Sequence, residues 1–276
     1  MSDAANPAQP RPEGPGLGEW AVPREVAVPR LLEQHGDRLY SLASRLCGAP
    51  EQAQDLVQET FLRAWRSWDT FEGRSDPKVW LFTIARNTCQ RLHRRRSGEP
   101  RQLESLDETG PFGEPRVAVL PSDFDAFDRV VRAEQEVALQ AAITTLPDEF
   151  RLPLVLKDVV GFSIAEVAAV LDLEPATVKT RVHRARLRLR DALASGLPHQ
   201  ELPPPAYSRQ VCLDLLRTKQ ESLDRGVPMP NGDQIVCERC RAVFATLDLT
   251  HDVCARLAES GMPPDLRELL ASRLSA

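Results

Sequence analysis

Cysteine and histidine residues near the end of the chain form the first group that could do chemistry. Cys237 and Cys240 are a C-x-x-C pair, Cys212 lies upstream, and His251 and Cys254 follow closely. Thiolate sulfur and imidazole nitrogen are ligands that tetrahedral zinc prefers, and a C-x-x-C pair can also cycle between thiol and disulfide. The sequence therefore predicts a zinc site or a thiol switch in the last quarter of the chain.

The spacing leaves the ligand set open. Two sets compete, namely Cys212, Cys237 and Cys240 with Asp233 or His251, and Cys237, Cys240, His251 and Cys254. In a third interpretation the C-x-x-C pair oxidises to a disulfide and releases the metal. In a fourth, these residues are buried free thiols, because cysteine is among the most buried residue types. Cys47 and Cys89 stand alone in amphipathic segments and are assigned to the core.

Positive charge is concentrated in one short segment. The 276 residues carry a formal charge of −5, yet the stretch from Lys179 to Arg190 holds six lysines and arginines and no acid. Apolar side chains recur there with helical spacing, and basic side chains recur with the same spacing one position later. The two series are Val178, Val182, Ala185 and Leu189, and Lys179, His183, Arg186 and Arg190, with Arg181, Arg184 and Arg188 widening the basic face. Such a helix can bind nucleic acid although the whole chain is acidic.

The elements that position this basic face form a helix-turn-helix pattern. One helix is predicted from Ser163 to Leu171, a tight turn follows, and Pro175 opens a second helix that runs to about residue 193. Ser163 and Glu166 have the spacing of a capping box. In the major groove, the N-terminal residues of the second helix would approach base edges and the later ones would hold phosphates. The predicted DNA-binding residues of this helix are Thr177, Lys179, Thr180, Arg181, His183, Arg184, Arg186 and Arg188.

Helical spacing also organises the rest of the chain. Three helices are predicted, over about residues 28–46, 51–68 and 77–93, and no strand-like alternation of any length appears. The predicted fold is all-α, with two small helical domains on a flexible linker and a small C-terminal helical module that contains the cysteines. The predicted boundaries are a disordered N-terminus (1–24), a first domain (25–96), an acidic linker (97–128), the helix-turn-helix domain (129–196), a Pro-rich linker (197–207) and the C-terminal module (208–276).

Composition excludes several classes of protein. Hydrophobic residues make up 42% of the chain, and no apolar run reaches the roughly 18 residues that a membrane-spanning helix needs. The first residues lack the apolar core of a signal peptide, so a cytoplasmic location is expected. The C-x-x-C pair does not sit in a βαβ pattern, and no nucleotide loop or nucleophile–base set is apparent, so the chain is not expected to be an enzyme.

Two runs of residues resemble one family. The run LPDEFRLPLVLKDVVGFSIAEVAAVLDLEPATVKTRVHRARLRLRDAL, residues 146–193, resembles region 4 of the extracytoplasmic-function sigma factors of the sigma-70 family, the domain that binds the promoter −35 element. The run AQDLVQETFLRAWRSWDTFEGRSDPKVWLFTIARNTCQRLHRRR, residues 53–96, resembles their region 2. Both occur in order without the region 3 domain. The resemblance implies a promoter-recognition subunit of RNA polymerase, and a standalone helix-turn-helix regulator is the alternative.

The resemblance also implies residue roles in region 2. One helix would grip the clamp of the polymerase β′ subunit through Asp55, Gln58, Glu59, Leu62 and Arg63. The −10 element would be read by Phe71, Arg74, Ser75 and Lys78 on a loop and by Arg86, Asn87, Arg91 and Arg94 on the next helix. Stacking surfaces and cations of this kind suit single-stranded DNA. The implied partners are core RNA polymerase, through the β′ clamp and the β flap, promoter DNA, and an anti-sigma factor.

The last module resembles a zinc-binding anti-sigma domain, although Asp233 stands where that family has histidine. This likeness implies zinc as a cofactor. It also suggests that the module regulates the rest of the chain in cis, by docking on the DNA-binding or polymerase-binding surfaces and releasing them on metal binding or oxidation.

Overall fold

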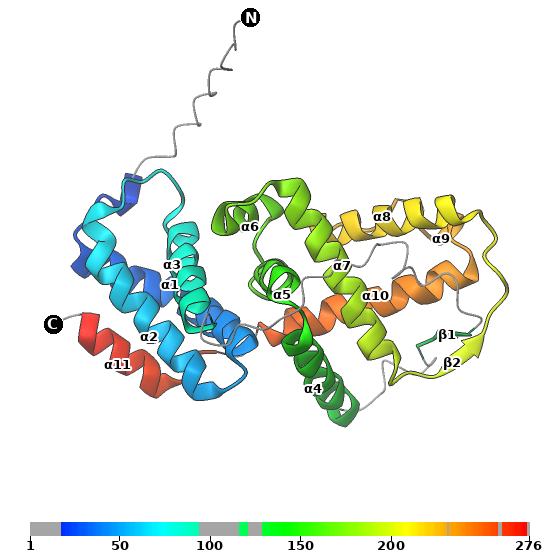
Figure 1. Cartoon of the computed structure of the whole chain (residues 1–276), viewed down its shortest axis with the longest axis horizontal. Helices are drawn as coiled ribbons and strands as arrows, with labels where there is room; N and C mark the ends of the chain where they lie inside the picture. Colours follow the sequence, from blue (N-terminus) through cyan, green and yellow to red (C-terminus); the bar gives the residue numbers. More distant parts are fainter. Residues whose placement is uncertain (1–17, 94–115, 121–128, 231, 259–260, 275–276) are drawn as a thin grey trace, which may run out of the picture.

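The described part of the protein is mostly helical, with one two-stranded sheet, which confirms the all-α prediction (Figure 1). A computed structural model describes residues 18–93, 116–120, 129–258 and 261–274, except residue 231. We divide them into an N-terminal body (18–93), a central body (129–196) and a C-terminal module (208–274). No helix in the described part of the chain is long and apolar enough to cross a membrane.

Three helices make the N-terminal body. They are α1 (Arg24–Cys47), α2 (Pro50–Ser67) and α3 (Pro77–His93), with single 3-10 turns η1 (Gly18–Trp20) and η2 (Trp68–Thr70). Gly48, at φ 71°, ends α1 in the left-handed conformation that favours glycine. Cys47 and Cys89 are buried in this core, as predicted. Trp20 packs 6.2 Å from Trp68, so the segment predicted to be disordered is ordered from residue 18 onward.

The central body contains the predicted helix-turn-helix. Its elements are α4 (Arg129–Thr145), α5 (Asp148–Leu154), a π-helical turn η5 (Val155–Val159), α6 (Ile164–Leu171) and α7 (Pro175–Ala194). The capping box of Ser163 and Glu166 is present at the start of α6. Asp172 takes a left-handed conformation, with φ 55°, in the turn between α6 and α7. Short polar residues tolerate this conformation best, which lets the chain turn tightly between the two helices.

The N-terminal and central bodies pack directly against each other and share one apolar core. Helix α6 lies against α3, and η5 lies against α1. Phe82 and Phe162 meet across this junction with ring centroids 4.8 Å apart. The two predicted helical domains are both present, and in this structure they pack together in a compact form.

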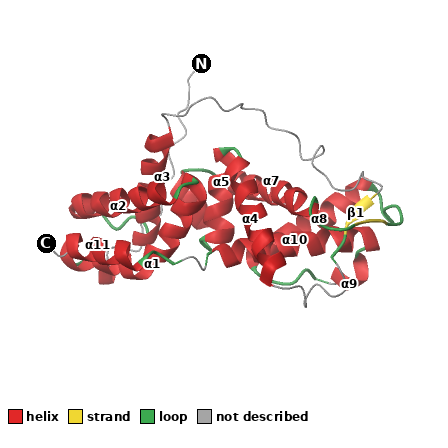
Figure 2. Ribbon diagram, turned by 90° about the horizontal axis from the view of Figure 1, so that it is seen from below, coloured by secondary structure: helices red, strands yellow, loops and turns green. Residues whose placement is uncertain are grey.

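The C-terminal module is an arrangement of helices that reaches both bodies (Figures 1 and 2). Its elements are α8 (Arg209–Arg225), α9 (Gly232–Ile235), α10 (Glu238–Leu257) and α11 (Pro264–Leu274). Helix α10 runs beneath α7 and α8 and packs on α7, α4 and η5, and α11 returns to α1 and α2. The carbonyl oxygen of Leu257 accepts hydrogen bonds from Ser41 (3.0 Å) and Arg45 (3.1 Å) of α1.

The predicted linkers contain the only two strands of the described residues. Strands β1 (Arg116–Ala118) and β2 (His199–Glu201) pair antiparallel, with Arg116 opposite Glu201. The prediction of no strand is therefore wrong here, because three residues are too few for an alternating pattern to be recognised.

The docking of α11 depends on apolar burial, so we expect Leu270→Ala to lower the free energy of unfolding by about 3 kcal/mol. Leu270 is fully buried, whereas its neighbour Leu269 is 38% exposed. Leu269→Ala is therefore the matched control and should cost about 0.5 kcal/mol or less. Urea unfolding measures both. Equal losses for the two variants would show that α11 does not pack as described.

Candidate nucleic-acid and polymerase interface

The start of α7 is the most accessible part of the helix-turn-helix. Thr180 is exposed and Thr177 partly exposed, and the Thr180 hydroxyl donates a hydrogen bond to the carbonyl oxygen of Ala176 (3.0 Å). Arg181 is held only loosely, with its guanidinium 3.9 Å from Glu149. These side chains lie where a recognition helix would approach base edges.

The later arginines of α7 pack against the central body. Arg184 is partly buried, and its Nε atom is buried with no hydrogen-bond partner. The Arg188 guanidinium lies over the ring of Phe150, 4.7 Å from its centroid. Cation–π contacts of this kind orient a guanidinium while leaving its edge able to donate hydrogen bonds.

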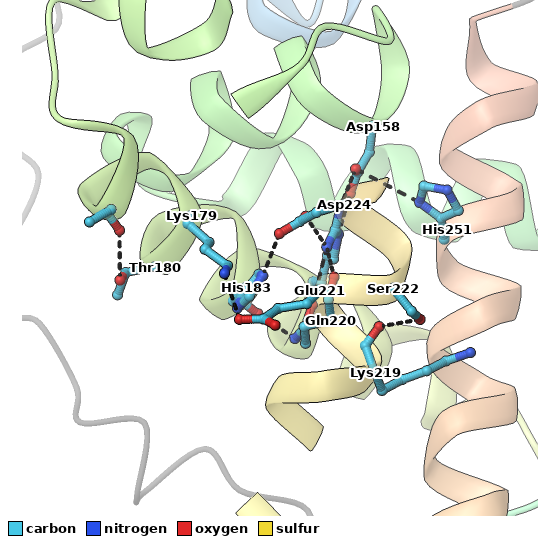
Figure 3. A network of polar contacts seen from close by, with 12 residues as sticks. Asp158, Lys179, Thr180, His183, Lys219, Gln220, Glu221, Ser222, Asp224 and His251 are labelled. Carbon is cyan, nitrogen blue, oxygen red and sulfur yellow. Dashed lines mark hydrogen bonds and ion pairs between the residues drawn. The ribbon is translucent and has the colours of Figure 1, made fainter. Parts of the chain in front are cut away.

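A second basic face of α7 is covered by the C-terminal module (Figure 3). The Lys179 ammonium lies 2.6 Å from a carboxylate oxygen of Glu221, and His183 Nε2 lies 2.8 Å from Asp224. Gln220 of α8 donates a hydrogen bond to the carbonyl oxygen of His183 (3.1 Å). The periodicity that predicted an exposed basic face therefore identified, on this side, an intramolecular interface.

Arg186 is the centre of this interface. Its guanidinium donates two 2.7 Å hydrogen bonds to Asp158 of η5 and one of 2.8 Å to Asp224 of α8. The Arg186 side chain is 2% exposed, so the prediction that it contacts DNA is corrected. It was predicted because its spacing matches that of Lys179, and spacing cannot distinguish water from buried carboxylates.

The electrostatics agree with this geometry. Burial alone would raise the pKa of Asp158, but the charge and hydrogen bonds of Arg186 outweigh it and lower that pKa below its ordinary value. Burial would also raise the pKa of Asp224, yet the hydrogen bond from His183 and the charge of Arg186 lower it. Both carboxylates are therefore ionised at neutral pH and compensate the buried guanidinium.

Sequence reasoning missed Asp158, Glu221 and Asp224. Asp158 lies in the run from Leu154 to Val160, in which most residues are apolar. An acid in such a run is rarely buried without a partner, and this was the available signal. Glu221 and Asp224 differ from ordinary surface acids only by the helix that they face, which the sequence does not reveal.

The residues predicted for the −10 element divide into three groups. Phe71 is 8% exposed, with ring centroids 5.2 Å from Trp68 and 5.0 Å from Trp80. It belongs to an aromatic cluster of the core, so its prediction as a DNA contact is corrected. Arg74 is exposed and pairs with Glu72, Ser75 is partly exposed, and Asn87 and Arg91 are exposed, while Arg94 lies outside the described residues.

Lys78 and Arg86, by contrast, contact the central body. The Lys78 ammonium lies 2.5 Å from Glu166, the residue that completes the capping box of α6. The Arg86 guanidinium donates a 2.8 Å hydrogen bond to the carbonyl oxygen of Val170. In this compact form, two side chains that were predicted to hold the −10 strand are therefore bound to α6 instead.

A groove runs between α2 and α3. It has a volume of about 550 Å³ and is lined by all five predicted polymerase-binding residues, Asp55, Gln58, Glu59, Leu62 and Arg63, together with Thr88 and Arg91. At its edge, Arg273 of α11 donates a 3.4 Å hydrogen bond to Gln58. The groove is a concave surface of mixed polarity that a helix of another protein could enter.

The structure separates the predicted metal ligands into two places. Cys212, Cys237 and Cys240 lie together between the starts of α8 and α10, where the Cys240 thiol is hydrogen-bonded to both of the others. His251 and Cys254 lie three to four turns further along α10, about 16 Å or more away at 1.5 Å per residue. His251 Nδ1 is instead 3.8 Å from Asp158, so neither residue can join Cys237 and Cys240 in one site. The side chain of Asp233 lies outside the described residues.

The three clustered thiols differ in acidity. Burial would raise the pKa of Cys237, but hydrogen bonds from the backbone amides of Ala206 and Cys240 lower it below its ordinary value. Burial raises the pKa of Cys240 and Cys212. Among the described side chains, no group of three or more His, Cys, Asp or Glu residues is arranged to hold a metal ion. The three clustered thiols would need a further ligand to hold zinc, and the zinc site stays a prediction.

Comparisons with known proteins match both bodies. The family model Sigma-70 region 2 matches residues 31–99, and Sigma-70, region 4 matches residues 136–189. The ECF RNA polymerase sigma factor SigW of Bacillus subtilis is 32% identical over 164 residues, which cover 59% of this chain and 87% of SigW. SigE of Mycolicibacterium smegmatis, named as the same kind of factor, is 37% identical over 186 residues, covering 62% of this chain and 64% of SigE, just under two thirds.

One similar solved structure is the sigma factor RpoE in complex with the anti-sigma factor NepR from Bartonella quintana. It aligns with a TM-score of 0.44 and 30% identity, over 59% of this chain and 94% of that chain. Both matched family models end at or before residue 189, so the C-terminal module lies outside them.

The buried Arg186 cluster generates a stability prediction. Asp158→Asn keeps the shape of the side chain but removes a charge that Arg186 needs, so we expect a loss of about 3 kcal/mol in the free energy of unfolding. The control is Asp248→Asn, which removes a surface partner of Lys219 that is 46% exposed and should cost less than about 1 kcal/mol. Urea denaturation at pH 7 compares the two variants. Similar losses of stability would show that Asp158 does not stabilise the protein as the buried partner of Arg186.

Proposed function

Because the chain belongs to the extracytoplasmic-function family of sigma-70 factors, we propose that it directs promoter-specific transcription initiation by bacterial RNA polymerase. The observation that carries this proposal is the groove between α2 and α3, whose lining contains every residue assigned to polymerase binding. A standalone helix-turn-helix regulator would have no use for such a groove.

In this proposal the two bodies read separate promoter elements. Thr177, Lys179, Thr180 and Arg181 approach base edges of the −35 element, and His183, Arg184 and Arg188 contact its phosphates. Arg74, Ser75, Lys78, Arg86, Asn87 and Arg91 hold the −10 strand, where cations balance the backbone of single-stranded DNA. The groove receives the β′ clamp. The central body is the part that would meet the β flap.

The compact form described above is incompatible with simultaneous binding to both elements. The −35 and −10 positions are about 25 base pairs apart, or roughly 80 Å of straight duplex at 34 Å per turn. The N-terminal and central bodies are in direct contact, and Lys78 and Arg86 are bound to α6. We infer that the bodies separate before initiation and that the compact form is inactive.

We further propose that the C-terminal module maintains this inactive state in cis. Helix α10 packs on the central body, and α11 packs on α1 and α2 of the N-terminal body, so the module connects the two. Arg267 of α11 pairs with Asp37 of α1, which also accepts a 2.8 Å hydrogen bond from the Met262 amide. These contacts support the proposal that the module holds the two bodies together.

The cluster of Cys212, Cys237 and Cys240 is the proposed sensing site of the module. It joins the start of α8 to the start of α10, the two helices that contact α7. A change at these thiols would therefore be transmitted to the recognition helix. Metal binding at this cluster would require a further ligand beyond the described side chains, whereas oxidation would require only an oxidant such as a peroxide.

Arg181→Ala and Arg184→Ala test the assignment of the recognition helix. A base contact contributes about 1–3 kcal/mol, so we expect Arg181→Ala to lower transcription about tenfold or more on promoters with an intact −35 element. Arg184→Ala removes a phosphate contact and should lower transcription to a similar extent on every template, whatever its sequence. The assay is run-off transcription with core polymerase, on templates that the wild-type protein selects from a randomised promoter library. Arg217→Ala, on the exposed side of α8, is the control and should have no effect.

If Arg181→Ala lost the same activity on templates without a −35 element, the assignment of Arg181 to base reading would be wrong. A wild-type protein that neither associates with core polymerase nor directs initiation would remove the proposed function altogether.

The double variant Cys237→Ser/Cys240→Ser tests the sensing site. We expect transcription by the wild-type protein to rise after addition of Zn²⁺ or hydrogen peroxide. The thiols connect α8 and α10, so a change at them would release the inactive state. The double variant should give the same output with and without either reagent. Cys47→Ala, which alters a core thiol of the N-terminal body, is the control and should respond like the wild type. An unaltered response in the double variant would exclude this cluster as the sensor.

A further inference from the structure

Helix α8 presents an acidic edge to the recognition helix, formed by Glu221 and Asp224 and extended by Gln220 (Figure 3). Its oxygen atoms lie 2.6 Å from the Lys179 ammonium, 2.8 Å from His183 and 2.8 Å from Arg186. These are the distances at which charged donors bind carboxylate or phosphate oxygens. The acidic edge therefore supplies Lys179 and His183 with anionic oxygens as a phosphate backbone would, whereas Arg186 stays buried and paired with Asp158.

We propose that the acidic edge of α8 is a built-in substitute for DNA phosphates, which duplex DNA must displace before α7 can enter the major groove. The inference rests on the proposed function and deepens it, because it identifies the competitor and the residues that are exchanged. In the closed state α7 binds anionic oxygens of α8. In the DNA-bound state it binds anionic oxygens of the DNA backbone.

The construction of the interface suits a reversible contact. Helix α8 packs its apolar side, including Cys212 and Leu216, in a cluster with α10 and with Leu187 of α7. Its other contacts with α7 are made by long polar side chains. The Lys179–Glu221 pair is 39% and 35% exposed, and pairs of that kind contribute little net stability and are screened by salt. Duplex DNA, with one charge for about every 1.7 Å of axis, can compete for these cations.

Arg186 explains how α8 can leave without a large penalty. A buried guanidinium without a partner would cost several kcal/mol. Arg186 retains its paired hydrogen bonds to Asp158, which belongs to the central body, when Asp224 is withdrawn. The central body can therefore lose α8 and keep its internal ion pair, so opening does not require unfolding.

The test uses the full-length chain and a fluorescently labelled 25-base-pair duplex of random sequence, because phosphate contacts do not depend on sequence. The variant is Glu221→Gln/Asp224→Asn, which removes the two charges and keeps the side-chain shapes. The matched control is Asp214→Asn/Asp252→Asn. It removes the same charge from the exposed surface of α8 and α10, where Asp214 contacts only Gln210 and Arg217 of its own helix among the described contacts.

Fluorescence anisotropy should show that the acidic-edge variant binds the duplex about tenfold more tightly than the wild type at low salt. The dependence of log K on log salt should be steeper by about one, as expected for roughly one additional phosphate contact. The control variant should bind like the wild type. Equal gains in both variants would mean that only net charge matters, and no gain in the acidic-edge variant would overturn the inference.

Hydrogen exchange of the wild-type protein provides a second measurement that does not depend on a variant. Backbone amides of α8 should exchange faster when the same duplex is added, because displaced α8 loses its contacts with α7. Unchanged exchange in α8 at saturating duplex would also overturn the inference. Neither experiment contains polymerase, so failure of the proposed function would appear separately, as absence of initiation while the duplex results stand.

Discussion

The buried ion cluster around Arg186 is the constraint on which the arrangement of the whole chain depends. One guanidinium satisfies Asp158 of the π-helical turn and Asp224 of α8, and so it connects the inner face of the recognition helix to the C-terminal module. A buried charge needs a charged partner, and Asp158 supplies one from within the central body. This requirement fixes the rotation of α7 about its axis, and that rotation determines which basic residues face outward and which face α8.

The same chain contains two kinds of interface with different physical properties. The contact of α11 with the N-terminal body is largely apolar, with Met262, Leu266 and Leu270 buried in the shared core. The contact of α8 with α7 is largely ionic. Apolar burial is little affected by moderate salt, whereas partly exposed ion pairs are screened by it. Helix α8 can therefore leave α7 while α10 stays packed on the central body and α11 stays packed on the N-terminal body.

Local structure could be predicted from the sequence, and long-range contacts could not. The capping box of Ser163, the Pro175 start of α7 and the apolar series beginning with Val178 follow from spacing and residue type, and the structure contains all of them. The same spacing placed Arg186 on an outer face, because a period of 3.6 residues does not reveal what lies opposite. Phe71 was assigned to DNA on its loop position, although two tryptophans enclose it. The metal-site prediction grouped His251 with Cys240 because they are close in sequence. Along one helix, a rise of 1.5 Å per residue places these two side chains far apart.

The π-helical turn from Val155 to Val159 has a consequence for how this protein can vary over evolutionary time. A π-helical turn holds one residue more than an α-helical turn, and Asp158 lies within it. Deleting a single residue here would restore a regular helix and rotate the following side chains by about 100°. Asp158 would then point away from Arg186. Descendants of this chain can therefore exchange Lys157, the one residue of the turn that is not buried, but they cannot shorten the turn without rebuilding the charge balance of the interior.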